Sequence, residues 1–144
     1  MKGWLLVIFF GVFFFLLSGC DSKTLDCRSF KITGMDTENA TEAKKNWYYY
    51  VVKTYDEYTD LLDKVVIPDT EKQKFNQEFF EEKILIFVLI NFPNGVKKLE
   101  VSAFLEEEDL VIDIKPQYNE YPTVETRRMG IEIEKVNYNQ IKFR

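Results

Sequence analysis

The sequence predicts a single small α+β domain, with a mostly antiparallel sheet of about six strands and one or two short helices. Three observations support this prediction. Residues 84–90 are an unbroken apolar run rich in β-branched side chains, which is typical of a strand covered on both faces. Residues 99–114 alternate between apolar and polar side chains, as a hairpin with one covered face does. The helical patterns precede this hairpin instead of alternating with strands, which favours α+β over α/β.

The first twenty residues have the pattern of a secretory processing signal. A charged start at Lys2 is followed by an uncharged, largely apolar run, which ends in Leu17-Ser18-Gly19-Cys20. These four residues resemble the lipobox of bacterial lipoproteins at every position. The resemblance implies a signal peptide over residues 1–19, cleavage before Cys20 and a lipid attached to the Cys20 thiol.

An uncleaved transmembrane anchor is the alternative interpretation, because the uncharged run approaches the roughly 18–20 residues that span a bilayer. Both interpretations place the rest of the chain outside the cytoplasm, on the bacterial cell membrane or outer membrane. A diacylglycerol anchor is stable, whereas a single acyl chain gives only marginal membrane binding. Membrane lipid, held through Cys20, is therefore the first expected partner.

Charge and composition disfavour several classes of function. The chain of 144 residues has a net charge of −5, and removal of Lys2 with the signal peptide would make it more negative. Nucleic acids require a cationic surface, so they are not expected partners. Histidine is absent, which removes the commonest general base and transition-metal ligand. We therefore expect no cofactor or metal, and no enzymatic activity.

Residues 20–46 are polar and broken by turn-forming side chains, with an alternating pattern only at Phe30 and Ile32. We expect a lipidated N-terminus and polar tether here, with at most one short strand. If Cys20 carries lipid, Cys27 has no partner in the mature chain, so it is either a thiol without a role or an intermolecular bridge.

The folded domain is expected over residues 47–144, where the composition changes. Residues 47–52 are aromatic and β-branched, which predicts a strand. Thr54 and Glu57 have the spacing of a capping box, and apolar residues at helical spacing predict a helix over residues 55–65, closed by Pro68. A second helical turn is expected over residues 76–82.

Turn and strand signals continue to the end of the chain. Asn94-Gly95 predicts a turn before the hairpin, and acidic residues 106–109 predict the turn within it. Residues 116–123 read as a loop, because they contain two prolines. Further strands are expected at residues 131–133 and 141–143, which completes an antiparallel meander late in the chain.

The order of these patterns resembles the C-terminal domain of the PrcB-like family of protease-complex subunits. The likeness covers residues 47–135 and rests on residues 50–58, 79–86, the hairpin and residues 130–135. That family comprises small secreted or lipid-anchored bacterial α+β domains. The resemblance implies a protein-binding role beside extracytoplasmic proteases. Residues 92–96 contain one glycine, where such domains usually have a Thr-Gly-Gly-Tyr-like turn.

Several residue clusters are candidates for chemistry or contact. Residues 106–109 supply four carboxylates for a hard cation, but they lack calcium-loop spacing, so a solvated turn is favoured. Paired acids at residues 56–57 and 81–82 are the basis for a glycan-cleaving alternative, although capping explains them with fewer assumptions. Tyr118 and Tyr121, on the proline-containing loop, are the best candidates for an interaction surface, although both rings can instead cap the core. The aromatic residues 47–50 can stack on sugars, but a core role is favoured.

These observations predict a membrane-anchored extracytoplasmic lipoprotein whose domain binds an envelope protein, with a possible protease association from the resemblance. The alternative from another class is a carboxylate-dependent enzyme or binder that acts on cell-wall glycans. A binder of a small envelope ligand is a third alternative, which requires a deep apolar pocket.

Overall fold

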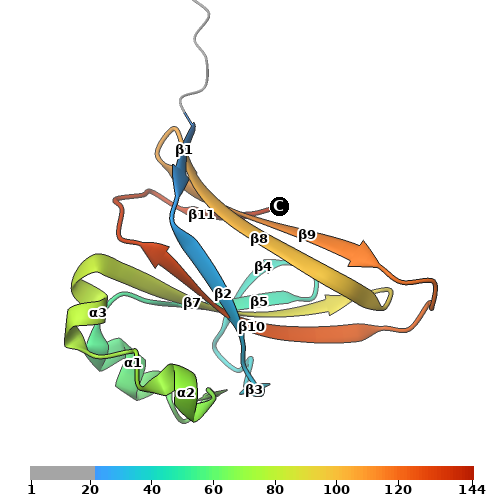
Figure 1. Ribbon diagram of the computed structural model, residues 1–144, viewed down its shortest axis with the longest axis horizontal. Coiled ribbons are helices and arrows are strands. Elements are labelled where there is room, and N and C mark those ends of the chain that lie inside the picture. Colours follow the sequence, from blue (N-terminus) through green and yellow to red (C-terminus); the bar gives the residue numbers. More distant parts are fainter. Residues whose placement is uncertain (1–21) are drawn as a thin grey trace, which may run out of the picture.

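Two β-sheets and a group of helices form three layers in the computed structural model, which describes residues 22–144 (Figure 1). We name the four-stranded sheet, in the order β1-β8-β9-β11, the outer sheet, and the five-stranded sheet, in the order β2-β10-β7-β5-β4, the central sheet. The strands are β1 (Ser22–Leu25), β2 (Cys27–Lys31), β3 (Gly34–Met35), β4 (Thr41–Lys44), β5 (Trp47–Val52), β6 (Val65–Val66), β7 (Lys83–Phe92), β8 (Val96–Glu106), β9 (Asp109–Tyr118), β10 (Glu125–Glu134) and β11 (Ile141–Phe143). The helices are α1 (Tyr55–Leu61), α2 (Asp69–Lys72) and α3 (Gln77–Glu82).

The central strand β7 explains the layering, because it is buried on both faces as predicted. Its side chains alternate between two hydrophobic clusters. Ile86 and Val88 belong to the cluster between the sheets, whereas Leu85 and Phe87 belong to the cluster under the helices. Strand side chains point alternately to opposite faces, so one apolar run serves both cores. The helices cover the face of the central sheet that points away from the outer sheet (Figure 1).

The expected single small domain of mostly antiparallel strands with short helices is confirmed, but the counts are not: residues 22–144 contain three helices instead of one or two. Residues 22–144 contain more than six strands, in two main sheets and the small pair β3-β6. The β8-β9 hairpin is confirmed, yet no meander follows it. β10 joins the central sheet beside β7, and β11 returns to pair parallel with β9. Local alternation predicts strands but not their partners, so the two-sheet arrangement was not predictable from it.

The helix predictions are confirmed at their starts and corrected at one end. The capping box joins Thr54 and Glu57, and Asn76 caps α3 through the backbone N–H of Phe79. α1 ends at Leu61 instead of residue 65, because β6 uses Val65 to pair with Met35. Pro68 therefore does not close α1. It is the N-cap residue of α2.

The expected polar tether is wrong for residues 22–46, and the folded domain does not begin at residue 47. β1 pairs with β8, and β2 pairs with β10. Leu25, Phe30, Ile32 and Met35 are all buried. The segment looks like a tether because its apolar residues are few and widely spaced. Leu25 joins the cluster between the sheets and the other three join the cluster under the helices, so the segment contacts both cores without containing a local run of apolar residues.

A close contact fixes β2 on the central sheet. Phe30 lies directly opposite Gly130 in the register of β2 and β10. A Cβ atom on Gly130 would lie 2.1 Å from Cζ of Phe30, so the ring occupies the space of the missing side chain. Phe30 also packs on Phe75, with the ring centroids 5.5 Å apart. This aromatic contact on glycine pins the register of the edge strand.

Candidate functional site

The strand β8 is covered along only half of its length on the side away from β9. β1 pairs with Ala103–Glu106 of β8 and ends at Leu25. The chain then crosses to the central sheet as β2 (Figure 1). Within residues 22–144, no strand pairs with residues 97–102 on this side of β8. Every second residue there directs its backbone N–H and C=O away from β9, so an open strand edge results.

A groove lies beside this open edge, between the two sheets. Its cavity volume is about 480 Å³, which is within the range of roughly 300–1,000 Å³ of ordinary ligand sites. Its apolar lining includes Leu99 and Val101 of β8 and Met129 of β10, together with Phe30 and Ile32. Met129 is buried, but Leu99 and Val101 stay half-exposed although they pack against the core between the sheets. We name this cavity the sheet groove.

The second strand bordering the sheet groove, β10, is also only partly paired. β2 pairs with Met129–Ile133 of β10, and the backbone N–H of Ile32 donates to the carbonyl of Arg128. On the β2 side, residues 125–127 have no strand neighbour within residues 22–144. Two open edges, one from each sheet, therefore border the same groove.

An ion pair closes one end of the sheet groove by holding the first residue of β8. The Glu125 carboxylate accepts from the backbone N–H of Val96 at 2.7 Å. The Arg127 guanidinium donates to the carbonyl of Val96 at 2.6 Å, and the two side chains pair with each other at 2.5 Å. Both backbone groups of Val96 are thereby satisfied. The start of β8 is fixed relative to β10 without a strand between them.

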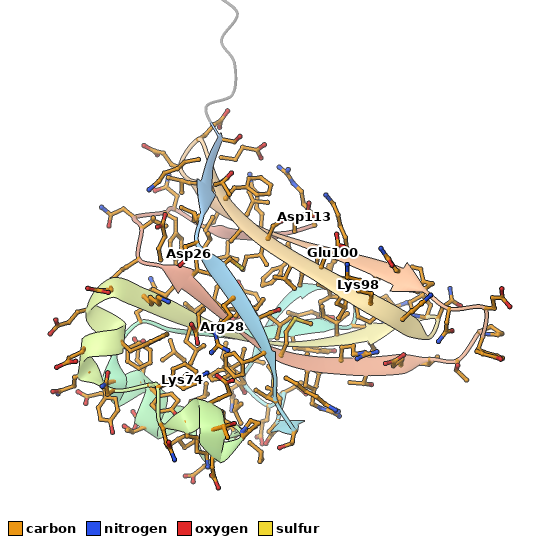
Figure 2. All side chains as sticks on the ribbon, viewed as in Figure 1. Asp26, Arg28, Lys74, Lys98, Glu100 and Asp113 are labelled. Atoms are coloured by element: carbon orange, nitrogen blue, oxygen red, sulfur yellow. The ribbon has the colours of Figure 1, made fainter. Side chains whose placement is uncertain are left out.

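The lining of the sheet groove is cationic, although the chain as a whole is acidic. Lys31, Arg127 and Arg128 line it, against the single carboxylate of Glu125. Lys97 and Lys98 lie exposed on the adjacent edge of β8. Lys98 pairs with Glu100 at 2.7 Å, on the face where Figure 2 shows both residues near Asp113. Glu100 offsets the charge of Lys98, but Lys97 and the cations of the lining still leave an excess of positive charge around the groove.

The two tyrosines predicted as an interaction surface lie near one end of this groove, but only Tyr121 is on a loop. Residues 116–118 pair with β8, so Tyr118 is the last residue of β9 and the predicted loop begins at residue 119 instead of residue 116. Tyr118 is 46% exposed and Tyr121 is 72% exposed, so neither is a buried cap of the core. Tyr118 still contacts Phe92 edge-on, with the ring centroids 6.3 Å apart. The loop of residues 119–124 is held to the turn before β8, because Gly95 donates to the carbonyl of Tyr121 and accepts from Asn119. Val124, 76% exposed, ends the loop directly before Glu125 of the groove.

Of the two cysteines, Cys20 lies outside the described residues. Cys27 belongs to β2, not to a tether, and it has no disulfide partner in residues 22–144. Burial, with smaller contributions from Asp26 and Glu132, raises the pKa of the Cys27 thiol to about 11. The thiolate is the reactive form, so this environment disfavours disulfide formation at Cys27.

The predicted acidic clusters have individual partners. The hairpin acids hold the C-terminal strand: Asp109 pairs with Lys142, Glu106 with Arg144, and Glu108 accepts from the Asn139 side chain. Within residues 22–144, no group of three or more potential ligands is placed to hold a metal ion. Asp56 and Glu81 do line one shallow cleft between α1 and α3. Both are exposed, whereas the general acid of a glycosidase lies in a less polar environment.

An ion-pair network on the helix side, which no sequence pattern indicated, positions β2. Arg28 of β2 donates to both carboxylate oxygens of Glu71 in α2, at 2.5 and 3.2 Å, and also to Glu132 of β10. Glu132 is only 5% exposed, and Lys83 lies 3.6 Å from it. Figure 2 shows Arg28 on β2 with Lys74 on the helix side. Hydrogen bonds from Arg28 hold the pKa of Glu71 below its ordinary value.

The aromatic residues of β5 serve the core, as favoured from the sequence. Trp47 and Tyr49 pack against the cluster between the sheets, and Tyr48 and Tyr50 against the cluster under the helices. Within residues 22–144, no helix is long and apolar enough to cross a bilayer.

Comparisons with known proteins give no match, whether with family models, curated proteins or solved structures.

The sequence analysis singled out the two tyrosines as contact candidates, but it did not predict the sheet groove. The alternating pattern predicts that Leu99 and Val101 face inward. It does not show that the central sheet leaves these two side chains partly exposed.

Proposed function

We propose that this chain is a bacterial lipoprotein, anchored outside the cytoplasm through lipid on Cys20, whose domain binds another protein of the cell envelope. The lipobox-like Leu17-Ser18-Gly19-Cys20 supports the anchor. The observation that carries the binding role is the exposed tyrosine loop at the end of the sheet groove. Aromatic side chains next to a partly apolar cavity are the composition of protein-interaction hot spots.

The resemblance to PrcB-like domains favours a partner among envelope protease complexes. Interface aromatic residues provide large contact areas with few rotatable bonds. The backbone hydrogen bonds of Gly95 restrict the loop that bears Tyr121, which lowers the entropy that binding costs. Tyr118 and Tyr121 are therefore the expected contact residues.

The experiment has two readouts on the full chain expressed in a bacterium. Mass spectrometry of the intact N-terminus is expected to find a chain that begins at Cys20 and carries diacylglycerol. A photo-crosslinking amino acid at position 121 is expected to form one dominant adduct in the envelope. The same crosslinker at position 55 is the control, because Tyr55 is a 36% exposed tyrosine in α1, away from the groove.

Two results would contradict the proposal. An unmodified Cys20 would remove the lipid anchor. Equal crosslinking from positions 121 and 55, or none from 121, would remove the binding role of the loop.

The glycan alternative rests on one observation, the placement of Asp56 and Glu81 in a common cleft. It requires that the chain release soluble fragments from purified cell walls and that Glu81→Gln abolish the release. Activity that survives both Glu81→Gln and Asp56→Asn would rule out this pair.

A further inference from the structure

We propose that the sheet groove takes up an extended, acidic segment of the partner protein, which pairs as an added strand with residues 97–102 of β8. This inference rests on the proposed function and deepens it, because it names the kind of segment that is bound and the backbone that holds it.

The first argument is the state of the β8 edge. β1 demonstrates that this edge accepts an antiparallel strand, since it pairs with Ala103–Glu106 in continuous register. The edge continues beyond Ala103 without a strand within residues 22–144, although β9 still supports its other side down to Val96. Strand addition gains affinity from main-chain hydrogen bonds on such an edge. An added segment would lie where β1 would continue if the chain did not cross to β2.

The second argument is the lining of the groove. An extended peptide presents alternate side chains to one side, and the side that faces the central sheet would meet Leu99, Val101 and Met129. Two of these three remain half-exposed, so small apolar side chains of the segment would complete the core at this end.

The third argument is charge, and it selects the class of segment. Lys31 from β2 and Arg128 from β10 line the groove, and Lys97 lies exposed on the adjacent edge of β8. Lysine on an edge strand discourages pairing between two identical edges. The same charges attract carboxylates, so they favour an acidic partner over a second copy of the β8 edge.

The test uses the full chain in detergent micelles and a fluorescent, end-capped peptide of alternating valine and glutamate. Three results are expected. Anisotropy reports saturable binding that weakens as salt is raised, because rim charges are screened. Hydrogen exchange slows in residues 97–102. A peptide with lysine in place of glutamate binds at least about tenfold more weakly, as expected for reversal of several exposed charge contacts.

Two double variants test the charge contacts of the groove, and one peptide analogue tests the backbone pairing with β8. Lys31→Glu with Lys97→Glu should weaken binding about tenfold, whereas Lys45→Glu with Lys72→Glu, which are exposed lysines elsewhere, should leave it unchanged. An analogue N-methylated at alternate residues keeps its side chains but loses N–H donors. It should bind at least about tenfold more weakly, because strand pairing needs those donors.

Four results would overturn the inference. They are equal binding of acidic and basic peptides, undiminished binding of the N-methylated analogue, protection that maps outside residues 97–102, and dimerisation of the chain with protection of residues 97–102 when no peptide is present. Crosslinking from position 121 together with no binding of the acidic peptide would also overturn it, while leaving the proposed function intact.

Discussion

The two halves of β8 have the same alternating pattern but different surroundings. Residues 103–106 pair with β1, and Ala103 is 1% exposed, although Leu105 stays half-exposed. Residues 97–102 have no strand on that side within residues 22–144, and Leu99 and Val101 stay half-exposed. The difference follows from one event, the crossing of the chain from the outer sheet to the central sheet at Asp26. A strand edge that is sealed stabilises the fold, whereas one left open is available to bind.

The largest expected effect compares leucines in the two regions. Leu25→Ala removes a side chain that is 4% exposed at the end of β1, opposite Ala103, so it should lower the free energy of unfolding by about 3 kcal/mol. Leu99→Ala in the open half should cost only about 1 kcal/mol, because less apolar area is lost. Urea unfolding measures both. Equal losses would mean that the open half is buried in solution, and the comparison would fail.

The next effect concerns the residue that holds β2 after the crossing. Arg28→Ala leaves Glu132 buried with only Lys83 as a cationic partner. Because Arg28 itself is partly exposed, we expect a loss of about 2 kcal/mol instead of the full cost of breaking a buried ion pair. Lys74→Ala, which removes an exposed partner of Glu71, is the control and should cost less than about 0.5 kcal/mol. A thermal or urea midpoint that is unchanged in Arg28→Ala would contradict this role.

A pH series tests the Arg28–Glu71 ion pair through a smaller expected change in the free energy of unfolding. Arg28 lowers the pKa of Glu71 in the folded chain, so the unfolded chain binds a proton more readily. The contribution of this pair is therefore complete above the ordinary glutamate pKa and is lost as the pH falls through the lowered value. Below about pH 4.5, unfolding free energies of the native chain should fall more steeply than those of Arg28→Gln. Parallel curves would exclude the pair as a source of acid sensitivity.

The smallest effect on stability is expected at the open end. Tyr121→Ala changes a side chain that is 72% exposed, so the free energy of unfolding should change by less than about 0.5 kcal/mol. Envelope crosslinking from a neighbouring position such as 124 should nevertheless fall sharply. Tyr55→Ala is the matched control and should leave the crosslink unchanged. A large loss of stability in Tyr121→Ala would make this residue part of the core.

Local sequence signals predicted those elements whose complete pattern lies within one segment of the chain. The β7 run, the capping box of Thr54 and Glu57, and the β8-β9 hairpin were all predicted, and their residues were placed correctly. These features depend on neighbours in the sequence, so periodicity and turn chemistry are enough to find them.

The sequence by itself determined a small domain of strands and short helices, the helix starts at Thr54 and Asn76, the β7 strand, the β8-β9 hairpin and the expectation of a lipid anchor at Cys20. Only the tertiary structure decided that residues 22–46 belong to the fold, that the strands divide between two sheets, and that β8 is left open beside β10. The physical reason is that register and pairing join residues far apart in the chain, as Phe30 and Gly130 do. Whether a strand edge is paired depends on where another segment of the chain stops pairing with it. No local sequence pattern indicates that position.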